Sequence, residues 1–227
     1  MSVVFRIAYR ELRGGLAGFR IFLLCLALGV MAITTVGSVR MAIEEGLEAE
    51  SDAILGGDAS MQFTYRMANE VELAWINDNT VQVSKIVDFR SMVLFDDGAS
   101  RERSLVQIKG IDGKYPLYGD VGLSGDMPLS TALAVSDGMP GLIAEQALFE
   151  RLGLEVGDIL RLGTKDFQLR AVLTSEPDGA ALGFSLGPRV IVETSALEGS
   201  GLMSAGTLFN SHYRLIFPEG TDGAMIA

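Results

Sequence analysis

The feature that most constrains this chain is an uncharged apolar run of 19 residues, from Ile21 to Val39. Arg20 and Arg40 flank the run. Because an α-helix rises 1.5 Å per residue, a helix of that length covers about 28 Å, close to the hydrocarbon thickness of a bilayer. We therefore expect one transmembrane helix at residues 21–39. Its membrane-embedded residues include Ile21, Leu24, Leu28 and Val39.

Two other kinds of segment have a similar composition. A buried core helix is usually shorter and carries a polar face. A cleaved signal peptide has an apolar region of roughly 7–15 residues that ends at a small-residue cleavage site. The run here is longer, and Thr34 to Ser38 lead into Arg40 without an Ala-x-Ala pattern. A permanent membrane helix fits these features best, and a secreted binding protein released by signal cleavage is the weaker interpretation.

Charge is distributed unevenly around this run. The net charge is −11, yet residues 1–20 carry four arginines against one glutamate, and the remainder carries 14 basic and 28 acidic side chains. Basic residues beside a membrane helix are retained on the cytoplasmic side. We therefore expect residues 1–20 in the cytoplasm and everything after the helix in the periplasm, at a bacterial inner membrane. The acidic excess outside argues against nucleic acid as a partner, because phosphate contacts need clustered Lys and Arg.

Short segments flank the predicted membrane helix on both sides. Apolar side chains at helical spacing in residues 1–20 predict an amphipathic helix on the inner membrane surface, with a solvated lead-in as the alternative. The basic residues that would contact the lipid bilayer are Arg6, Arg10, Arg13 and Arg20. Gly14 and Gly18 predict a flexible corner before the membrane. Residues 40–57 predict an acidic helical stalk that ends at Gly56-Gly57.

Residues 58–227 have the pattern of one mixed α/β domain. Leu142–Leu152 has helical periodicity with Gly153 as its stop, and Tyr115–Gly141 has the Gly, Pro, Asp and Ser content of a long loop. We expect strands at 59–65, 81–95, 103–111, 159–162, 167–173, 189–193 and 213–217, with helices at 68–77 and 195–202. The helix at 68–77 offers Val71, Leu73, Trp75 and Ile76 to a core. The predicted class is α+β, one membrane helix followed by a mixed extracytoplasmic domain that continues beyond Ala227.

A search for catalytic chemistry finds little. The one histidine, His212, has no Ser or Cys partner that the sequence can nominate, and Cys25 lies inside the apolar run. The carboxylates show no spacing typical of a zinc or calcium site. Gly110 to Lys114 falls short of a phosphate-binding loop, because position 108 is Ile and Tyr115 follows the lysine. We expect no catalytic residue, no cofactor and no bound metal, so any ATP would be bound by another chain.

Several segments resemble a known family. They are LGGDASMQF at 55–63, VSKIVDFRSMV at 83–93, VQIKGIDGKYPLYGDVGL at 106–123, ALFERLGLEVGDILRLGTKDFQLRAVLTSEPD at 147–178 and LGPRVIVE at 186–193. Together with the basic segment FRIAYRELR and the apolar run, they resemble the permease subunits of FtsX-like and MacB-like ABC transporters. Within that group the chain is most similar to permeases partnered with a LolD-like ATPase.

This resemblance implies the N-terminal fragment of an inner-membrane permease with a domain of the MacB periplasmic core type. That domain would handle a hydrophobic or lipid-like substrate or transmit force across the membrane. The resemblance also implies a cytoplasmic ABC ATPase subunit as partner and a permease without catalytic residues of its own, and it leaves a homodimer open. The alternative, from another class, is a membrane-anchored extracytoplasmic enzyme or sensor whose α/β domain is the whole working part.

Overall fold

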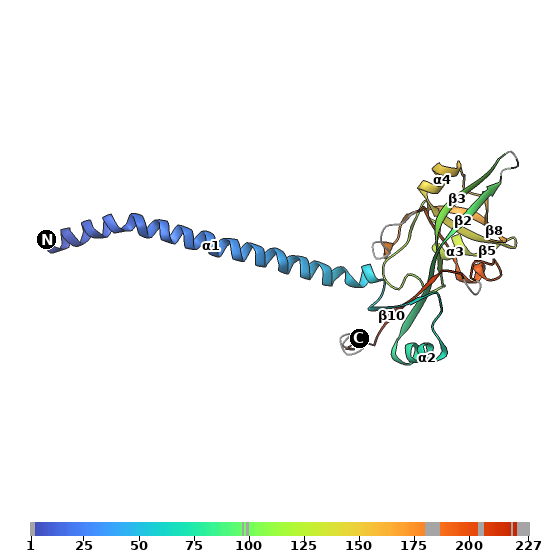
Figure 1. Cartoon of the computed structure of the whole chain (residues 1–227), viewed down its shortest axis with the longest axis horizontal. Helices are drawn as coiled ribbons and strands as arrows, with labels where there is room; N and C mark the ends of the chain where they lie inside the picture. The colour runs from blue at the N-terminus through green and yellow to red at the C-terminus, as the bar shows by residue number, and fades with distance from the viewer. Residues whose placement is uncertain are drawn as a thin grey trace. The chain divides into compact units, whose positions relative to one another are not determined.

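The chain consists of two units, residues 1–50 and 51–227. The computed structural model describes residues 3–96, 98, 100–179, 187–203, 207–218 and 220–221. In helix α1 (Val3–Leu55) it describes the side chains of residues 6–7 and 19–43. Most of α1 makes up the described part of the first unit, and the second unit is a folded domain (Figure 1).

Helix α1 is continuous over 53 residues, so the corner predicted at Gly14 and Gly18 is not formed. Glycine inside a helix costs about 1 kcal/mol relative to alanine, which weakens the helix without breaking its hydrogen-bond ladder. The helix also continues without a break through the predicted stalk and ends one residue before Gly56, which has a φ of +66°. The stop at Gly56-Gly57 is therefore confirmed, because the left-handed backbone there suits glycine.

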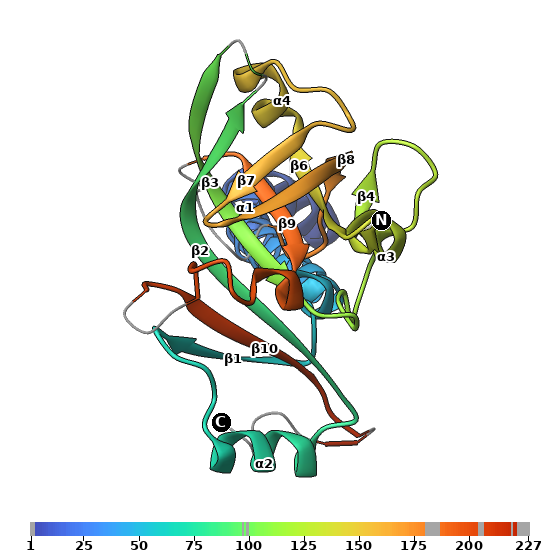
Figure 2. The ribbon, with the colours of Figure 1, turned by 90° about the vertical axis from the view of Figure 1, so that its right-hand side faces the viewer.

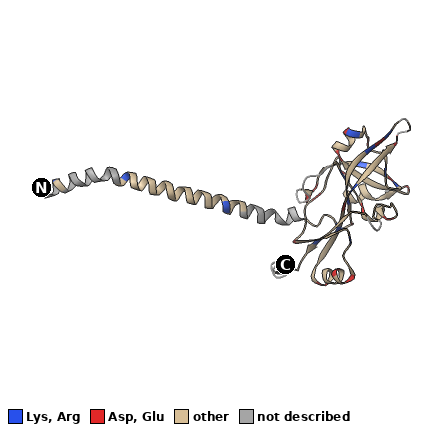
Figure 3. Ribbon diagram, viewed as in Figure 1, with Lys and Arg blue, Asp and Glu red and all other residues tan. Residues whose placement is uncertain are grey.

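The stretch Phe19–Ile43 of α1 is apolar and long enough to cross a membrane, with a mean hydropathy of 2.2. None of its most apolar part is buried in the structure, whereas a core helix of a soluble domain would be largely buried. In Figure 3 the stretch between its two basic bands carries no charged residue. The hydroxyls of Thr34 and Thr35 donate to the carbonyl of Met31 at 3.0 and 2.7 Å, so their polar groups are satisfied within the helix. A helix with these properties suits hydrocarbon.

The second unit is built around one large sheet. After α1 its elements are β1 (Ala59–Thr64), α2 (Glu70–Asn79), β2 (Gln82–Asp96), β3 (Arg101–Ile111), β4 (Gly122–Leu123), α3 (Leu129–Leu133), β5 (Val135–Ser136), β6 (Met139–Glu145), α4 (Gln146–Leu152), β7 (Ile159–Leu162), β8 (Lys165–Ser175), β9 (Arg189–Glu193), η2 (Thr194–Leu197) and β10 (Asn210–Ile216). The described strands pair in the order β1-β10-β2-β3-β9-β6-β8-β4, with β5 on β6 and β7 against β2 and β8. Figure 2 shows the long strand β2, which pairs with β10 over its first residues and with β3 over its last.

Strand β2 divides the domain into a small part and a large part. Its first residues pair with β10, and its last residues pair with β3. The large part has two apolar clusters, in which strands β3, β6, β8 and β9 contribute fully buried side chains such as Ile108, Leu142 and Val190. In the small part, α2 packs on β1 and β10 over a cluster whose buried members are Ala68, Ile76, Tyr213, Leu215 and Phe217. Burial of these side chains supplies the main driving force for folding.

The predicted helix at Leu142–Leu152 is wrong in its first third. Residues 142–145 belong to β6, which lies between β8 and β9 with Leu142 and Ile143 fully buried. A short apolar run cannot be assigned to helix or strand by periodicity alone, and here the two neighbouring strands decide. The helix α4 begins at Gln146 and ends before Gly153, whose φ of +63° confirms the predicted stop.

Three other expectations need correction. The stretch 115–141, predicted as one long loop, contains β4, α3, β5 and the start of β6. Helix α2 begins two residues later than predicted, because Asn69 forms a capping box with Glu72. Of its four predicted core residues only Ile76 is buried, while Val71 is 79% exposed. The reason is that the sheet covers only one side of the helix, so the rest of its surface stays exposed.

Candidate functional site: a buried charge cluster

The predicted membrane-surface residues lie on α1. Arg6 and Arg20 are exposed, and the side chains of Arg10 and Arg13 lie outside the described residues. The predicted membrane-embedded residues Ile21, Leu24, Leu28 and Val39 are all exposed. Exposure of these side chains agrees with a lipid-facing helix, and contact with a membrane stays a prediction.

His212 lies in β10 between Gln62 of β1 and Ile86 of β2. Its side chain is buried, and burial together with the nearby Arg214 cation lowers its pKa. Among the residues that the structure describes, no group of three His, Cys, Asp or Glu side chains is placed to hold a metal ion.

The turn at Gly110–Lys114 has a structural role. Asp112 accepts hydrogen bonds from the Ser84 hydroxyl at 2.8 Å and from the Lys85 N–H at 2.7 Å, both on β2. It also accepts the N–H of Lys114 at 3.2 Å, which closes the turn after β3. The sequence interpretation of a polar turn rather than a phosphate-binding loop agrees with this geometry.

Five charged side chains meet inside the domain. They are Lys109 of β3, Glu176 and Asp178 in the segment after β8, Arg189 of β9 and Arg214 of β10, and each is at most 6% exposed. Lys109 Nζ lies 2.6 Å from Asp178 Oδ1 and 3.6 Å from Glu176 Oε1. Arg189 pairs with Glu176, and Arg214 Nη2 lies 3.4 Å from Asp178 Oδ2. We call this group the charge cluster.

Asp178 is the central acceptor of the charge cluster. The Tyr115 hydroxyl lies 2.5 Å from Asp178 Oδ1 and 2.8 Å from Lys109 Nζ, so three groups converge on one point. The carboxylate of Asp178 is fully buried, and a buried charge of this kind persists only when partners compensate its lost hydration. The charge cluster therefore ties the segment at 176–178 to three strands of the sheet.

The environment shifts the pKa values of the charge cluster in different directions. Burial lowers the pKa of Lys109, and the two carboxylates beside it only partly offset that effect. Burial raises the pKa of Glu176, again against the pull of Lys109 and Arg189. Burial would also raise the pKa of Asp178, but Lys109, Tyr115 and Arg214 outweigh it and the net shift is downward. The surroundings of Asp178 thus favour its charged form.

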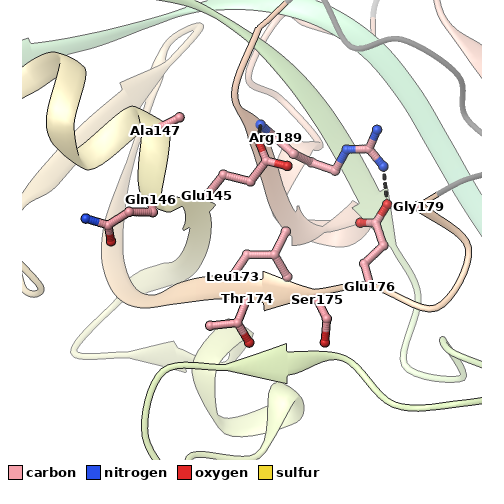
Figure 4. A pocket seen from close by; sticks show the side chains of 9 residues that line it. All are labelled: Glu145, Gln146, Ala147, Leu173, Thr174, Ser175, Glu176, Gly179 and Arg189. Carbon is pink, nitrogen blue, oxygen red and sulfur yellow. Dashed lines mark hydrogen bonds and ion pairs between the residues drawn. The ribbon is translucent and has the colours of Figure 1, made fainter.

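A surface pocket of about 530 Å³ lies next to the charge cluster (Figure 4). Its lining residues are Glu145, Gln146, Ala147, Leu173, Thr174, Ser175, Glu176, Gly179 and Arg189. The guanidinium of Arg189 points toward Glu176, and Glu145 accepts the backbone N–H of Arg189 at 2.9 Å. Glu176 Oε2 and Arg189 Nε have no hydrogen-bond partner within the described part of the chain. Both atoms are buried, so neither faces the open space of the pocket.

The first residues after α1 pack directly against the charge cluster and β10. A Cβ on Gly56 would lie 3.4 Å from the Asp178 Cβ, and one on Gly57 would lie 2.9 Å from the Leu215 carbonyl oxygen. Asp58 accepts the backbone N–H of Phe217 at 2.8 Å and the Tyr118 hydroxyl at 2.8 Å. The segment where the chain enters the domain is therefore held against the end of β10, and we call these contacts the junction.

Sequence reasoning missed every member of the charge cluster. A signal was present, because Lys109 and Arg214 each lie among apolar residues of a predicted strand and Arg189 begins another. A charge at such a position needs a buried partner. The sequence could not name that partner, since Asp178 is separated from Lys109 by 69 residues.

Comparison with known proteins places the fold in a family. Residues 21–222 match the model of the MacB-like periplasmic core domain. The chain belongs to this family. The resemblance to FtsX-like and MacB-like permeases is thereby confirmed, as is the α+β class with one N-terminal apolar helix. An apolar helix joined to a MacB-like periplasmic domain indicates a membrane-anchored chain.

Individual relatives agree with this assignment to the MacB-like family. The uncharacterized ABC transporter permease YbbP of Escherichia coli (strain K12) is 24% identical over 196 residues, which cover 84% of this chain and 22% of YbbP. The chain thus spans about a fifth of that relative's length.

Two solved structures are also similar to this chain. The periplasmic region of MacB from Actinobacillus actinomycetemcomitans is 10% identical, with a TM-score of 0.47, over 76% of this chain and 81% of that one. The extracellular domain of the ABC-type transporter YknZ from Gram-positive bacteria is 15% identical, with a TM-score of 0.44, over 74% and 87% of the two chains.

Proposed function

We propose that this chain is the N-terminal membrane helix and periplasmic domain of an ABC transporter permease in a bacterial inner membrane. A separate cytoplasmic ATPase subunit, of the LolD-like kind that the resemblance implies, supplies the energy. Membership of the MacB-like family and the printed name of the YbbP relative support the permease role. The net positive charge of residues 1–20 supports a cytoplasmic N-terminus.

The proposed organisation follows the charge and hydropathy of the chain. Residues 1–20 lie in or along the cytoplasmic membrane surface through Arg6, Arg10, Arg13 and Arg20, and residues 21–39 cross the bilayer. Residues 40–57 connect the membrane to the periplasmic domain at 58–227. Helix α1 runs without a break from Val3 to Leu55, so the proposed membrane segment and the stalk belong to one helix.

Of the tasks that the resemblance implies, the geometry supports force transmission best. The observation that carries this proposal is the junction, where Asp58 holds the N–H of Phe217 at 2.8 Å and its own N–H donates to Leu215 at 2.9 Å. A displacement at the end of α1 therefore acts at once on β10, the strand that pairs with both β1 and β2. A hydrophobic or lipid-like substrate moved by that force is part of the proposal.

Hydrogen exchange in membranes tests the coupling. The full-length permease and its ATPase are reconstituted in nanodiscs, and exchange of the β1 and β10 amides is compared with and without a non-hydrolysable ATP analogue. We expect the ATP analogue to change the exchange rates of these amides in the wild type and to change them much less in Asp58→Ala. The matched control is Asp78→Ala on the exposed side of α2, which should respond as the wild type does. An unresponsive wild type contradicts coupling, and a fully responsive Asp58→Ala contradicts the route through the junction.

The orientation is tested by labelling in intact cells. In a Cys25→Ser background, single cysteines replace Arg6 and the exposed Asp126, and a membrane-impermeant maleimide is added from outside. The proposal requires labelling at position 126 and protection at position 6 until the cells are broken. The reverse pattern would place the domain in the cytoplasm and overturn the proposed topology.

A further inference from the structure

Another pocket lies over one of the two apolar clusters of the large part. It has a volume of about 590 Å³, which is within the usual range for sites that bind small molecules. The pocket lies between the turn after β3, the start of α3 and the end of β9. Of its apolar lining, Ile111 and Leu133 are buried members of that cluster, and Val121 and Leu129 pack against it. An apolar body in this pocket would therefore contact the cluster and be removed from water.

Glu193 places a carboxylate on the apolar side of the sheet at this pocket. It is the last residue of β9 and lies beside Ile111 of β3 in their parallel pair. Ile191, two residues earlier, is a fully buried member of the same cluster, and side chains two apart in a strand point to the same face. Within the described part of the chain, the partly buried carboxylate of Glu193 has no hydrogen bond or ion pair. Its position suits a ligand that combines an apolar surface with a positive charge.

Two further carboxylates line the pocket, and they give it one sign of charge. Asp120 is exposed and, among the residues that the structure describes, has no partner. Asp112 is fixed by the three hydrogen bonds of the turn after β3, so it adds negative potential. The described residues that line the pocket include no Lys, Arg or His. Lys109 lies 4.3 Å from the centre of the Tyr115 ring, but Asp178 at 2.6 Å compensates its charge.

We propose that this pocket binds a small organic cation, an amine with an apolar body. The apolar body lies against Ile111, Leu129 and Leu133. The ammonium group donates hydrogen bonds to the carboxylates of Glu193 and Asp120. An anionic ligand would be repelled by these carboxylates. The inference goes beyond force transmission and does not depend on it.

The composition of the pocket favours an organic cation over a metal ion. The described residues offer no group of three His, Cys, Asp or Glu side chains that could hold a metal ion. Its walls are largely apolar, as they are in sites for small organic molecules. A hydrogen bond between charged groups is about twice as strong as a neutral one. We therefore expect an amine to bind about tenfold more tightly than an alcohol of the same shape.

Methyl NMR on the 227-residue chain in detergent tests the proposal. The probes are phenethylamine and phenethyl alcohol, which share an apolar body and differ in charge at neutral pH. The reporter is the methyl group of Met127, which lines the pocket and is 40% exposed. Met92 of β2 is 48% exposed and lies outside the pocket, so its methyl group reports non-specific contact. We expect the amine to shift the Met127 signal alone, with a dissociation constant about tenfold below that of the alcohol.

Substitutions that remove charge identify the groups that recognise the amine. In the double variant Glu193→Gln with Asp120→Asn, the amine should bind no more tightly than the alcohol, and the affinity for the alcohol should stay at the wild-type value. The matched control is Asp78→Asn on the exposed side of α2, which should keep the preference for the amine. Leu129→Ala removes part of the apolar wall and should weaken the binding of both probes by a similar factor.

Three results would overturn the proposal. Equal affinity of the wild type for the two probes would mean that the pocket does not recognise charge. A preference for the amine that survives in the double variant would place the cation elsewhere. Shifts of the Met92 signal as large as those of Met127 would mean that the probes contact the surface at large. The samples contain neither ATPase nor nucleotide, so none of these results bears on the proposed coupling.

Discussion

Replacement of Asp178 by asparagine is the sharpest test of the charge cluster. The substitution keeps the shape of the side chain and removes the charge that faces Lys109 at 2.6 Å, Tyr115 at 2.5 Å and Arg214 at 3.4 Å. Removing one partner of a buried ion pair costs about 3–5 kcal/mol, because the other charge stays buried without compensation. Lys109 keeps Glu176 at 3.6 Å, so we expect the lower end of that range, about 3 kcal/mol.

The free energy of unfolding can be measured on the whole chain in detergent. The single tryptophan, Trp75, reports on the small part of the domain, and circular dichroism reports on the sheet. Coincident urea transitions by the two probes would establish two-state unfolding. For a domain of this size, about 3 kcal/mol corresponds to a fall in Tm of roughly 6–12 °C. Asp126→Asn, at an exposed position, is the matched control and should change neither value.

A double-mutant cycle decides whether the interaction between Lys109 and Asp178 causes the loss of stability. Lys109→Met alone should also destabilise the domain, since Asp178 then loses its nearest cation. The double variant should cost less than the sum of the two, with a coupling of about 1–3 kcal/mol. A loss below about 1 kcal/mol in Asp178→Asn, or additive losses in the cycle, would refute the argument that this pair holds the segment at 176–178.

The pKa shift of Asp178 predicts how the stability of the wild type and of Asp178→Asn depends on pH. The pKa of Asp178 is lowered in the folded state, so its contribution to stability is full above the unfolded value near 4 and is lost as the pH falls through the lower folded value. The raised pKa of Glu176 acts in the opposite direction, and both proteins retain that residue. The stability difference between wild type and Asp178→Asn should therefore narrow only below about pH 4.

Three further predictions concern local features. The ion pair with Arg66 lowers the pKa of Glu72 to about 2, so Arg66→Gln should move the NMR titration midpoint of Glu72 upward; an unchanged midpoint would contradict the pairing. Asn69→Ala removes the capping box of α2 and should lower the free energy of unfolding by about 1 kcal/mol in urea titrations, whereas no loss would mean that the cap is dispensable. Gly141→Ala would place a Cβ 1.8 Å from a backbone carbonyl oxygen of α3, so thermal melting should show a loss of roughly 2–3 kcal/mol, while Gly113→Ala, with open space around it, should melt as the wild type does.

Local rules predicted the elements that carry their own signals. The strand at 189–193 was predicted with the bounds that the structure has, because a run of β-branched residues ends at a polar turn. The strands predicted at 81–95 and 103–111 are also formed, as β2 (Gln82–Asp96) and β3 (Arg101–Ile111). Such features depend on neighbours along the chain, which the sequence displays directly.

Elements that depend on distant neighbours were predicted less well. The apolar side chains of Leu142 to Ala144 suit a buried helix as well as a buried strand. Pairing with β8 and β9 makes these residues a strand. The loop predicted at 115–141 acquired short elements because α3 packs on β6 and β8. For these segments the competing local preferences differ by less than the energy of tertiary packing.

The sequence by itself determined the apolar helix, the charge asymmetry across it and the family, because each depends on composition or on short matched segments. The tertiary structure alone decided the charge cluster and the junction at Asp58. Each of these joins residues that are far apart in the chain, such as Asp58 and Phe217 at a separation of 159 positions. Such contacts form only when the whole sheet folds, since chain connectivity gives no local preference for them.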